Sequence, residues 1–245
     1  MGESQIQTPH PTADTGVGLT SRRRAGRSVP ASPLQQTHPP GSDRATGVRP
    51  SLPAGPVIAN RRYLRIKHAL DRVLAAAAIV LLLPLLAVLA AVVRIDSSGP
   101  AIFRQRRIGQ HGQPFTTYKF RTMRVDAPTY SLKVGDDDPR ITRVGRLLRR
   151  TALDELPQLW NIVRGEMSWI GPRPEQPFLV EGYADWQRAR LRVRPGLTGW
   201  WQVRRRSNEQ MHEHTDLDIY YVEHLSPWLD LKIVLMTPWA IWRQS

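Results

Sequence analysis

The 245-residue chain contains no cysteine, which excludes disulfide bonds and thiolate metal ligands. Acidic residues are scarce beside basic ones, with 21 Asp and Glu against 35 Lys and Arg, so the formal net charge is +14. A surplus of this size predicts an anionic partner, such as a nucleotide, a lipid phosphate or an acidic membrane face. A basic surface that only aids solubility fits the charge equally well, so other features must decide.

Residues 1–60 contain no aromatic residue and show no hydrophobic periodicity, while they hold nine of the 21 prolines. This composition predicts a disordered extension. The segment also has no apolar core of the kind that a secretory signal requires. Its one basic cluster is expected either to be solvated or to contact anionic lipid weakly. The cluster consists of Arg22, Arg23, Arg24 and Arg27.

A long apolar run extends from Val73 to Val93, and its 21 residues are enough to cross a bilayer as one helix. Pro84 lies near the centre, where a proline removes one helical hydrogen bond and bends the axis. Both flanks are basic, and the positive-inside rule places each of them on the cytoplasmic side. A re-entrant helix broken at Pro84 satisfies this pattern, and a plain span remains the alternative. The flanks are Arg61, Arg62, Arg65, Lys67 and Arg72 before the run, and Arg94, Arg104, Arg106 and Arg107 after it.

The residues after this run predict a β-hairpin and then an amphipathic helix. Apolar and polar residues alternate between 101 and 123, with Gly and Pro between them, which favours the hairpin. Asp138-Pro139 is a helix-start signal with Asp138 as the N-cap, and the helix is expected to lie in the membrane interface. Its apolar face is Ile141, Val144, Leu147 and Leu148. In the hairpin, Ile102, Phe103 and Ile108 are expected beneath the membrane, with Arg104, Arg106 and Arg107 at the lipid headgroups.

The segment from Leu153 to Pro174, LDELPQLWNIVRGEMSWIGPRP, combines two adjacent carboxylates with an apolar helical face. Asp154 and Glu155 lie among cations, and such carboxylates serve phosphoryl transfer as a nucleophile, a metal ligand or both. The structural alternative is a capping box from Thr151 to Asp154, and one carboxylate can cap while the other faces a ligand. The cations are Arg149, Arg150, Arg164 and Arg173, and the apolar face is Leu156, Leu159, Trp160 and Val163.

Beyond Pro174, residues 177–193 predict a helix and residues 195–207 a glycine-containing loop. Residues 214–242 predict two helices, and their tryptophans favour a position at the membrane interface. His212 and His214 resemble a metal pair, but without a third ligand a solvated loop is preferred. A loop is also preferred for Asp136, Asp137 and Asp138. The tryptophans are Trp228, Trp239 and Trp242.

Residues 151–174, TALDELPQLWNIVRGEMSWIGPRP, closely resemble the signature of the monotopic phosphoglycosyl transferases. These bacterial sugar transferases move a phosphosugar from a nucleotide sugar to polyprenyl phosphate. The resemblance extends from about Lys67 to Trp242, through IFRQRRIG, YKFRTM, DPRITRVGRLLRR, RPGLTGW and LSPWLDLKI in the expected order. It implies a re-entrant anchor broken at a proline, here Pro84. Many members have Ser before that proline, whereas this chain has Leu83.

The resemblance also implies roles for single residues. Asp154 would be the nucleophile that forms a covalent phosphosugar aspartate, and also a Mg²⁺ ligand, while Glu155 would position it or assist proton transfer. A carboxylate that attacks a diphosphate meets repulsion, so arginines and Mg²⁺ must neutralise both reactants. For the two basic residues of YKFRTM, a solvated face is the alternative. The implied phosphate- and substrate-binding positions are Arg149, Arg173, Lys119, Arg121, Pro172, Gly199 and Gln202.

One motif departs from the family pattern. Members commonly read PGLTGWAQVNGR where this chain reads PGLTGWWQVRRR, so Trp201 stands in place of Ala. The following Arg204, Arg205 and Arg206 stand where the pattern has Asn, Gly and Arg. These arginines could bind phosphate or be exposed, which leaves the chemistry on the donor side open.

Together these patterns predict a mainly α-helical protein with a small β-hairpin. Residues 1–60 would be a disordered extension, 61–98 the re-entrant membrane anchor, and 99–245 a compact catalytic head with interfacial amphipathic helices. The expected reaction transfers a sugar 1-phosphate from a nucleotide diphosphate sugar, UDP-linked by resemblance, to polyprenyl phosphate. Its products would be a polyprenyl diphosphosugar and UMP.

The expected location is the cytoplasmic face of a bacterial cell membrane, in contact with membrane lipid, at the first membrane step of exopolysaccharide, capsule or other glycan synthesis. The alternative function is that of a basic membrane protein without catalysis, which binds anionic lipid or organises polysaccharide assembly. Nucleic acid is disfavoured as a partner, because the basic residues are not interleaved with stacking aromatics. The identity of the sugar and the formation of a homodimer are left open.

Overall fold

The computed structural model describes residues 61–130, 138–204 and 214–243. The predicted disordered extension over 1–60, with its arginine cluster, lies outside the described residues. The same holds for Asp136, Asp137, Arg205, Arg206 and His212.

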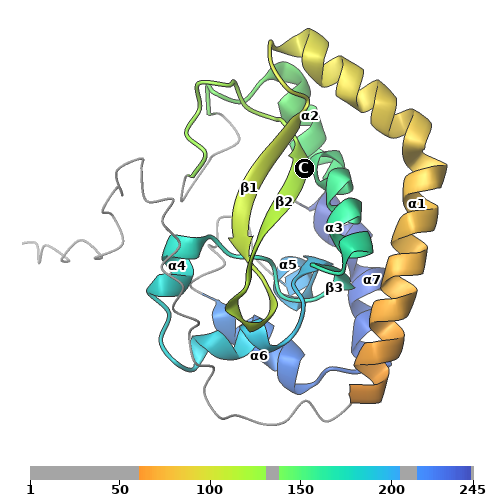
Figure 1. Ribbon diagram of the computed structural model, residues 1–245, viewed down its shortest axis with the longest axis vertical. Coiled ribbons are helices and arrows are strands. Elements are labelled where there is room, and N and C mark those ends of the chain that lie inside the picture. The colour runs from red at the N-terminus through yellow and green to blue at the C-terminus, as the bar shows by residue number, and fades with distance from the viewer. Residues whose placement is uncertain (1–60, 131–137, 205–213, 244–245) are drawn as a thin grey trace, which may run out of the picture. The chain divides into compact units, whose positions relative to one another are not determined.

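Helix α1 (Arg61–Asp96) is the longest element and contains the apolar run. Among the described helices, it alone is long and apolar enough to cross a membrane. The helix is not interrupted at Pro84, where the sequence predicted a break; instead α1 changes direction about half-way along (Figure 1). A proline removes a single backbone hydrogen bond, so a helix of strong helix formers bends there and does not end.

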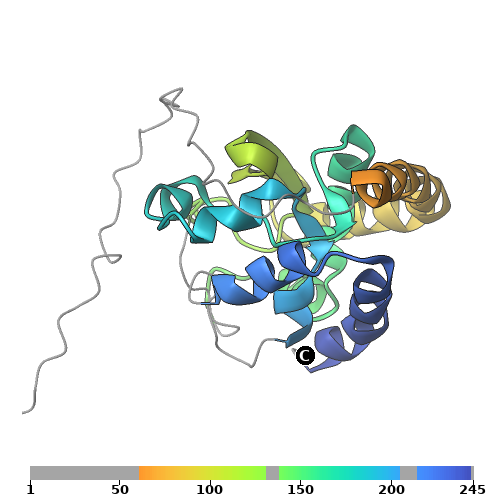
Figure 2. The same cartoon turned by 90° about the horizontal axis from the view of Figure 1, so that it is seen from below.

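A buried polar cluster holds the first half of α1 against helix α7 (Pro227–Trp242), and we call it the α1–α7 clamp. Lys67 Nζ lies 2.8 Å from Asp230 Oδ2. Tyr63 and Tyr221 also donate their hydroxyl groups to Asp230, at 2.6 and 2.8 Å. The start of α7 lies near this end of α1, which is orange in Figure 2. Because every charge in the clamp has a partner, the desolvation of these buried groups is compensated.

The predicted hairpin is present as strands β1 (Ile102–Ile108) and β2 (Pro114–Phe120), which pair antiparallel with Ile102 opposite Phe120. The expected position of Arg107 at the lipid headgroups is wrong. Its guanidinium donates to Gln105 Oε1 at 2.6 Å and to the carbonyl of Pro174 at 3.4 Å. Arg107 therefore packs against the protein, whereas Arg104 and Arg106 are exposed.

Helix α2 (Arg143–Arg150) begins four residues later than predicted. Thr142 is the N-cap, and its hydroxyl accepts from the backbone N–H of Gly145 at 2.9 Å. Asp138 accepts from the backbone N–H of Arg140 at 2.9 Å, so it closes a turn and is not the cap. Of the predicted apolar face, Leu148 is buried whereas Leu147 is 61% exposed, and the position of this helix in the membrane interface stays a prediction.

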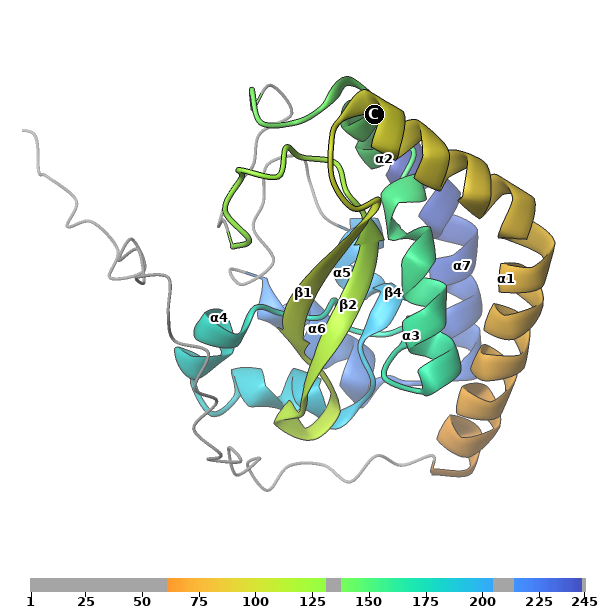
Figure 3. The same cartoon turned by 45° about the horizontal axis from the view of Figure 1, so that its top comes forward.

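The central segment forms a short 3₁₀ helix, η3 (Leu153–Gln158), followed by α3 (Leu159–Arg164). Helix α3 packs against α1 and against β2, so the hairpin, α3 and α1 follow one another in Figure 3. Leu159 and Ile162 are buried with Ala75 of α1. Trp160 was predicted on the same apolar face but is 51% exposed. The change from 3₁₀ to α geometry at Leu159 shifts the angular spacing of side chains, so one helical pattern does not fit both pieces.

A second sheet was not predicted. Strand β3 (Ser168–Ile170) pairs parallel with β4 (Gly196–Thr198), and β4 lies within residues 195–207, which were expected to be a loop. The backbones of Gly171 and Gly196 are in close contact, since a Cβ on Gly196 would lie 2.1 Å from Gly171 N. Glycine at 196 therefore permits the pairing rather than marking a loop.

The predicted helix over 177–193 is two short pieces, α4 (Pro177–Glu181) and η4 (Gln187–Arg192). Gly182 ends α4, and the side chain of Gln187 then accepts from the backbone N–H of Ala184 at 2.9 Å. That local hydrogen bond competes with a continuous helix and fixes a turn.

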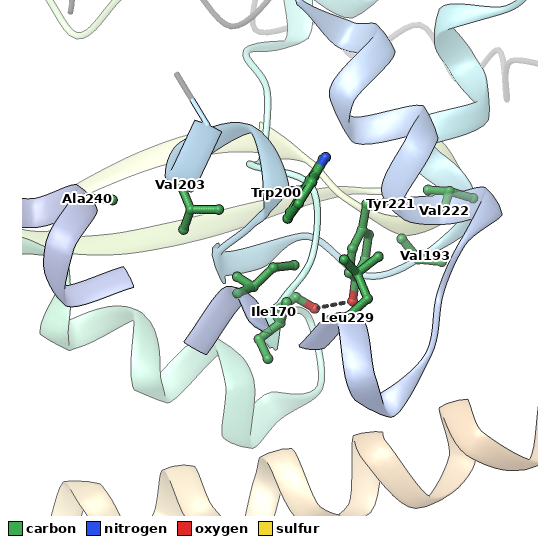
Figure 4. Close-up of a cluster of buried hydrophobic side chains, with 9 residues drawn as sticks. Ile170, Val193, Trp200, Val203, Tyr221, Val222, Leu229 and Ala240 are labelled. Carbon is green, nitrogen blue, oxygen red and sulfur yellow. Dashed lines mark hydrogen bonds between the residues drawn. The ribbon is translucent and has the colours of Figure 1, made fainter. Parts of the chain in front are cut away.

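The last part contains α5 (Trp200–Arg204), α6 (Thr215–Glu223) and α7. The two helices predicted over 214–242 are confirmed as α6 and α7. They enclose a core around Trp200, Tyr221 and Ile233, and the Tyr221 hydroxyl donates to the carbonyl of Ile170 at 3.2 Å (Figure 4). The tryptophans at positions 228, 239 and 242 are all exposed.

Candidate active site

The acid pair stands on η3, and the chain enters this helix through a left-handed residue. Ala152 has φ 54° and ψ 16°, which turns the backbone between α2 and η3. Thr151 does not form the predicted capping box, because its hydroxyl donates back to the carbonyls of Leu147 and Leu148, at 2.9 and 3.2 Å. In a 3₁₀ helix, consecutive side chains are separated by about 120°. Asp154 and Glu155 therefore point in well-separated directions.

Glu155 is held by two cations. Its Oε1 atom accepts from Lys119 Nζ at 2.5 Å and from an Nη2–H of Arg173 at 2.8 Å. Burial by itself would raise the pKa of Glu155, but the charges and hydrogen bonds of Arg173 and Lys119 hold it well below its usual range. Glu155 is therefore an anion at every pH at which the protein is expected to work.

Asp154 lies in a different environment. Its side chain is 9% exposed, and it accepts no hydrogen bond from the residues that the structure describes. Burial raises the pKa of this carboxyl group; Lys119 opposes the shift, and the adjacent charge of Glu155 adds to it. A carboxylate that is poorly solvated and makes no hydrogen bond is a better nucleophile and metal ligand than one that is already paired.

Arg149 approaches Asp154 from α2. Its Nε–H donates to Thr122 Oγ1 at 2.9 Å, and its charge acts with those of Lys119 and Arg173 to lower the pKa of Asp154. The backbone of Thr122 also contacts α2, because its carbonyl accepts from Thr142 N–H at 3.0 Å. Gly145 fits beside it only because it has no side chain, since a Cβ there would lie 2.1 Å from the Thr122 carbonyl oxygen.

Asn161 joins the hairpin to α3 below the acid pair. It is fully buried, and its amide donates to the carbonyl of Thr116 at 2.6 Å and to Glu166 Oε2 at 2.8 Å. Its own oxygen accepts from the backbone N–H of Tyr118 at 3.3 Å. These bonds fix β2 against α3, and Lys119 is the residue after Tyr118. Asn161 therefore helps to place the cation that binds Glu155.

The structure brings together five of the predicted site residues. Three cations surround the two carboxylates of Asp154 and Glu155, and they are Lys119, Arg149 and Arg173. Arg164 does not join them, because its guanidinium lies 3.1 Å from Glu166 Oε1.

Arg121 has different contacts. It is buried, and it donates to the carbonyl oxygens of Ser97 and Ser98 at 2.6 and 2.7 Å. These bonds tie the end of α1 to the end of β2. The guanidinium of Arg121 is thus engaged by backbone acceptors rather than by the two acids.

Pro172, Gly199 and Gln202 lie around the β3–β4 pair. The Pro172 carbonyl accepts from Gly196 N–H at 2.8 Å, and the Gln202 amide donates to the Leu197 carbonyl at 2.9 Å. Gly199 is packed on backbone, since a Cβ would lie 2.1 Å from the Gly171 carbonyl oxygen. Pro172 and Gly199 therefore lie in or against the segment that leads into Arg173, whereas Gln202 holds β4.

The oxygen atoms of the acid pair suit a metal cation that binds substrate phosphates as well as the protein. Mg²⁺ prefers oxygen ligands and commonly uses one or two carboxylates, phosphate oxygens and water. Asp154 fits this role, because no described residue donates a hydrogen bond to its carboxylate. Within residues 61–130, 138–204 and 214–243, no group of three or more His, Asp or Glu side chains could form a metal cage made of protein alone.

A cavity of about 700 Å³ opens beside the end of α1 and the start of α2. Its lining includes Ser97, Arg124 and Thr142, and neither member of the acid pair. The cavity therefore does not enclose Asp154.

Comparison with known proteins identifies the family. Residues 62–244 match the family described as Bacterial sugar transferase. The chain belongs to the bacterial sugar transferase family. The match includes every described element except the first residue of α1.

Several characterised relatives of this sugar transferase chain have similar sequences. It is 42% identical over 210 residues to the UDP-glucose:undecaprenyl-phosphate glucose-1-phosphate transferase of Caulobacter vibrioides, which covers 82% of this chain and 78% of that protein. It is 40% identical over 185 residues to the protein of the same name from Escherichia coli, covering 70% of this chain and 39% of the relative. A third relative is the UDP-N-acetylgalactosamine-undecaprenyl-phosphate N-acetylgalactosaminephosphotransferase of Aeromonas hydrophila, 36% identical over 190 residues, covering 75% of this chain and 45% of the relative. The chain thus spans less than half of the Escherichia coli and Aeromonas proteins.

Some residues of this bacterial sugar transferase that shape the site were not identified from the sequence. Thr122 and Asn161 place Arg149 and Lys119, and Arg190 contacts the backbone of Arg173. Asn161 and Arg190 carry polar groups within otherwise buried surroundings, which is a signal for a structural hydrogen bond. The contacts that matter for the site, from Asn161 to Thr116 and from Arg190 to Arg173, join residues 45 and 17 positions apart, so the pattern alone could not identify the partners.

Proposed function

We propose that this chain transfers a sugar 1-phosphate from a UDP-linked sugar to polyprenyl phosphate, through a covalent phosphosugar aspartate on Asp154. The observation that carries the proposal is the contrast between the two acids. Glu155 is neutralised by Lys119 and Arg173, while the buried Asp154 accepts no hydrogen bond from a described residue. The activities for which the relatives are named support the substrate classes.

In the first step, an oxygen of Asp154 attacks the phosphorus that bears the sugar. An aspartyl O–P bond forms and the bridging P–O bond of the diphosphate breaks, so UMP leaves with the bonding electron pair. Lys119, Arg149 and Arg173 surround the carboxylate and offset the repulsion between it and the diphosphate. Arg173 is 32% exposed at its side chain, so its guanidinium can contact phosphate while it remains paired with Glu155.

In the second step, a phosphate oxygen of the polyprenyl acceptor attacks the same phosphorus. The aspartyl O–P bond breaks, which restores the Asp154 carboxylate and releases the polyprenyl diphosphosugar. Glu155 is a weak base because its pKa lies below the usual range. Its role is therefore to position Lys119 and Arg173, and the proton of a monoanionic acceptor passes to solvent.

A divalent cation such as Mg²⁺ would be held by Asp154 together with phosphate oxygens of the donor, and when bound it neutralises phosphate charge. The protein groups around it supply the remaining positive charge.

We further propose that α1 enters and leaves the membrane by the cytoplasmic face, as the anchor of a head formed by residues 99–245. Its apolar side chains are widely exposed, with Val80, Leu81 and Val88 all more than half accessible. Exposed basic residues flank these side chains on both ends of the helix, which the positive-inside rule places on one side. The exposed tryptophans of α7 support a position of that helix at the interface.

The decisive experiment incubates the full chain with polyprenyl phosphate and a panel of nucleotide sugars, with Mg²⁺ or with EDTA, and measures UMP. We expect Mg²⁺-dependent UMP release with a UDP-sugar, and a radiolabelled sugar phosphate on the protein when the acceptor is omitted. Release of UDP instead of UMP would contradict the mechanism. No release with any donor would favour the non-catalytic alternative, a scaffold that binds anionic lipid.

A further inference from the structure

Arg190 forms the centre of a buried polar cluster outside the acid pair. Its side chain is 1% exposed, although it carries a full charge. Its guanidinium donates to the Tyr183 hydroxyl and to Asp218 Oδ2, each at 2.5 Å, and lies 3.8 Å from Glu175 Oε2. We call these four residues the Arg190 cluster. A buried charge of this kind is costly unless its partners satisfy it, so its position needs an explanation.

The contact that distinguishes Arg190 is with the backbone. Its Nη2 group also donates to the carbonyl oxygen of Arg173 at 2.7 Å. The side chain of the same Arg173 donates to Glu155 at 2.8 Å. A single residue therefore separates the buried cluster from the acid pair.

The segment around Arg173 is fixed at four successive carbonyl groups. Gly196 N–H donates to the Pro172 carbonyl at 2.8 Å, and Ile108 N–H donates to the Glu175 carbonyl at 2.9 Å. Between them, the Arg173 carbonyl accepts from Arg190 and the Pro174 carbonyl accepts from Arg107 at 3.4 Å. The prolines at 172 and 174 restrict φ as well.

The two inner bonds come from arginine side chains, and these arginines share an acid. Arg107 Nη1 lies 3.7 Å from Glu175 Oε1, while Arg190 lies beside the other oxygen. Burial and the nearby charge of Arg173 lower the pKa of Arg107 to about 10. Three guanidinium groups are thus crowded around the segment, and Glu175 and Asp218 keep two of them in place.

We propose that Arg190 is a positioning residue for Arg173. By holding the Arg173 carbonyl, it aims the Arg173 guanidinium at Glu155 and at the substrate phosphates. This inference rests on the proposed function for its catalytic meaning, but the geometry that it asserts is independent of any reaction.

The competing explanation is that the cluster only stabilises the core. Both explanations predict a loss of stability when Arg190 is changed, so stability does not separate them. They differ in their prediction for Arg173. Only if Arg190 positions Arg173 does a substitution of Arg190 disturb the contact between Arg173 and Glu155.

The first test measures the reaction of Arg173 with phenylglyoxal in the full chain in detergent, followed by mass spectrometry of the peptide that contains it. The reagent attacks the neutral guanidine, and the charge of Glu155 raises the pKa of Arg173, so the pair protects it. We expect Arg190→Lys, which keeps the charge but loses the planar fork, to speed this modification several-fold. Tyr183→Phe, which removes one acceptor and keeps the ring, should act in the same direction to a smaller extent.

The matched control is Lys67→Arg in the α1–α7 clamp. It exchanges one buried cation for another in the same way, but Lys67 pairs with Asp230 and Asp71. Its Arg173 should react at the wild-type rate. Equal Arg173 rates in wild type, Arg190→Lys and Tyr183→Phe would overturn the inference, and so would an acceleration in Lys67→Arg as large as that in Arg190→Lys.

The second test is a double-mutant cycle on UMP release. Arg190→Lys should lower kcat about tenfold in the wild-type background, because small displacements of a charged group in a catalytic site have effects of that order or larger. In an Arg173→Lys background, the same change should cost less than about twofold. If Arg190→Lys lowered kcat by the same factor in both backgrounds, the positioning role would be overturned. If the wild-type chain released no UMP, the proposed function would fail, while the phenylglyoxal rates would still decide the inference.

Discussion

Asp154 and Glu155 are adjacent in the chain, yet their carboxylates lie in opposite electrostatic situations. Glu155 accepts two charged hydrogen bonds and has a lowered pKa, whereas Asp154 accepts none from the described residues and has a raised pKa. Groups whose environments drive their pKa values apart commonly have separate tasks. Here one acid organises the cations and the other is left to react.

Replacing Asp154 by Asn should abolish transfer and raise thermal stability. Burial raises the pKa of this carboxyl, so its charged form is less favourable in the folded state than in the unfolded chain. At neutral pH the charge therefore lowers stability, and the isosteric amide removes that cost. Thermal unfolding and labelling by a radiolabelled donor measure the two effects. Retained covalent label in the Asn variant would exclude Asp154 as the nucleophile.

Replacing Glu155 by Gln should slow turnover by about 10²-fold or more, because Lys119 and Arg173 lose the charge that holds them. The stability of the Gln variant should also fall less steeply than that of the wild type as the pH is lowered. The folded pKa of Glu155 is lowered, so its contribution is complete above the unfolded value of about 4.3 and is lost as the pH falls through the folded value. Thermal midpoints measured from pH 6 down to pH 3 test this. An equally steep decline in both proteins would show that the ion pairs of Glu155 contribute nothing.

Replacing Gly145 by Ala should destabilise the fold by about 1–3 kcal/mol, as expected for overpacking. The new Cβ would lie 2.1 Å from the carbonyl oxygen of Thr122, and the displacement would reach Arg149 through its hydrogen bond to Thr122. UMP release should fall as well. Gly182→Ala is the control, because its Cβ would meet only the Leu179 carbonyl oxygen, at 3.6 Å. Chemical denaturation compares the two, and equal stabilities would contradict the prediction.

The proposed path of α1 can be tested by labelling, because the chain has no cysteine of its own. Single Arg65→Cys and Arg104→Cys variants should both react with a membrane-impermeant thiol reagent from the cytoplasmic side. Reaction of the two positions from opposite sides would establish a span. Gln113→Cys, in the loop between β1 and β2, serves as the marker for the side of the catalytic head.

The sequence was sufficient to predict the elements that depend on local pattern. The apolar run of α1, the β1–β2 hairpin and the helices α6 and α7 follow from hydrophobic length, alternation and helical spacing. The acids and the cations Lys119 and Arg173 were also predicted, from motifs that resemble the family. Their mutual contacts stay implicit in such motifs until the structure is known.

What the sequence did not yield depends on contacts between distant residues. The β3–β4 pair has only three residues in each strand and joins positions 28 apart, so no local alternation marks it. The α1–α7 clamp links Lys67 with Asp230. From the sequence, Lys67 was interpreted only as one of the basic residues that flank the apolar run. The predicted capping box failed for a different reason, since Thr151 ends one helix instead of starting the next.

The left-handed backbone of Ala152 has a further consequence. An alanine in this region costs on the order of 1 kcal/mol relative to an ordinary conformation, and nothing in its own methyl group repays that cost. The direction of the Asp154 side chain is thus set by the backbone torsion angles of Ala152, two residues earlier, and not by contacts to the carboxylate itself. The carboxylate of Asp154 therefore needs no hydrogen bond from a described residue to set its direction, because the backbone at Ala152 sets it.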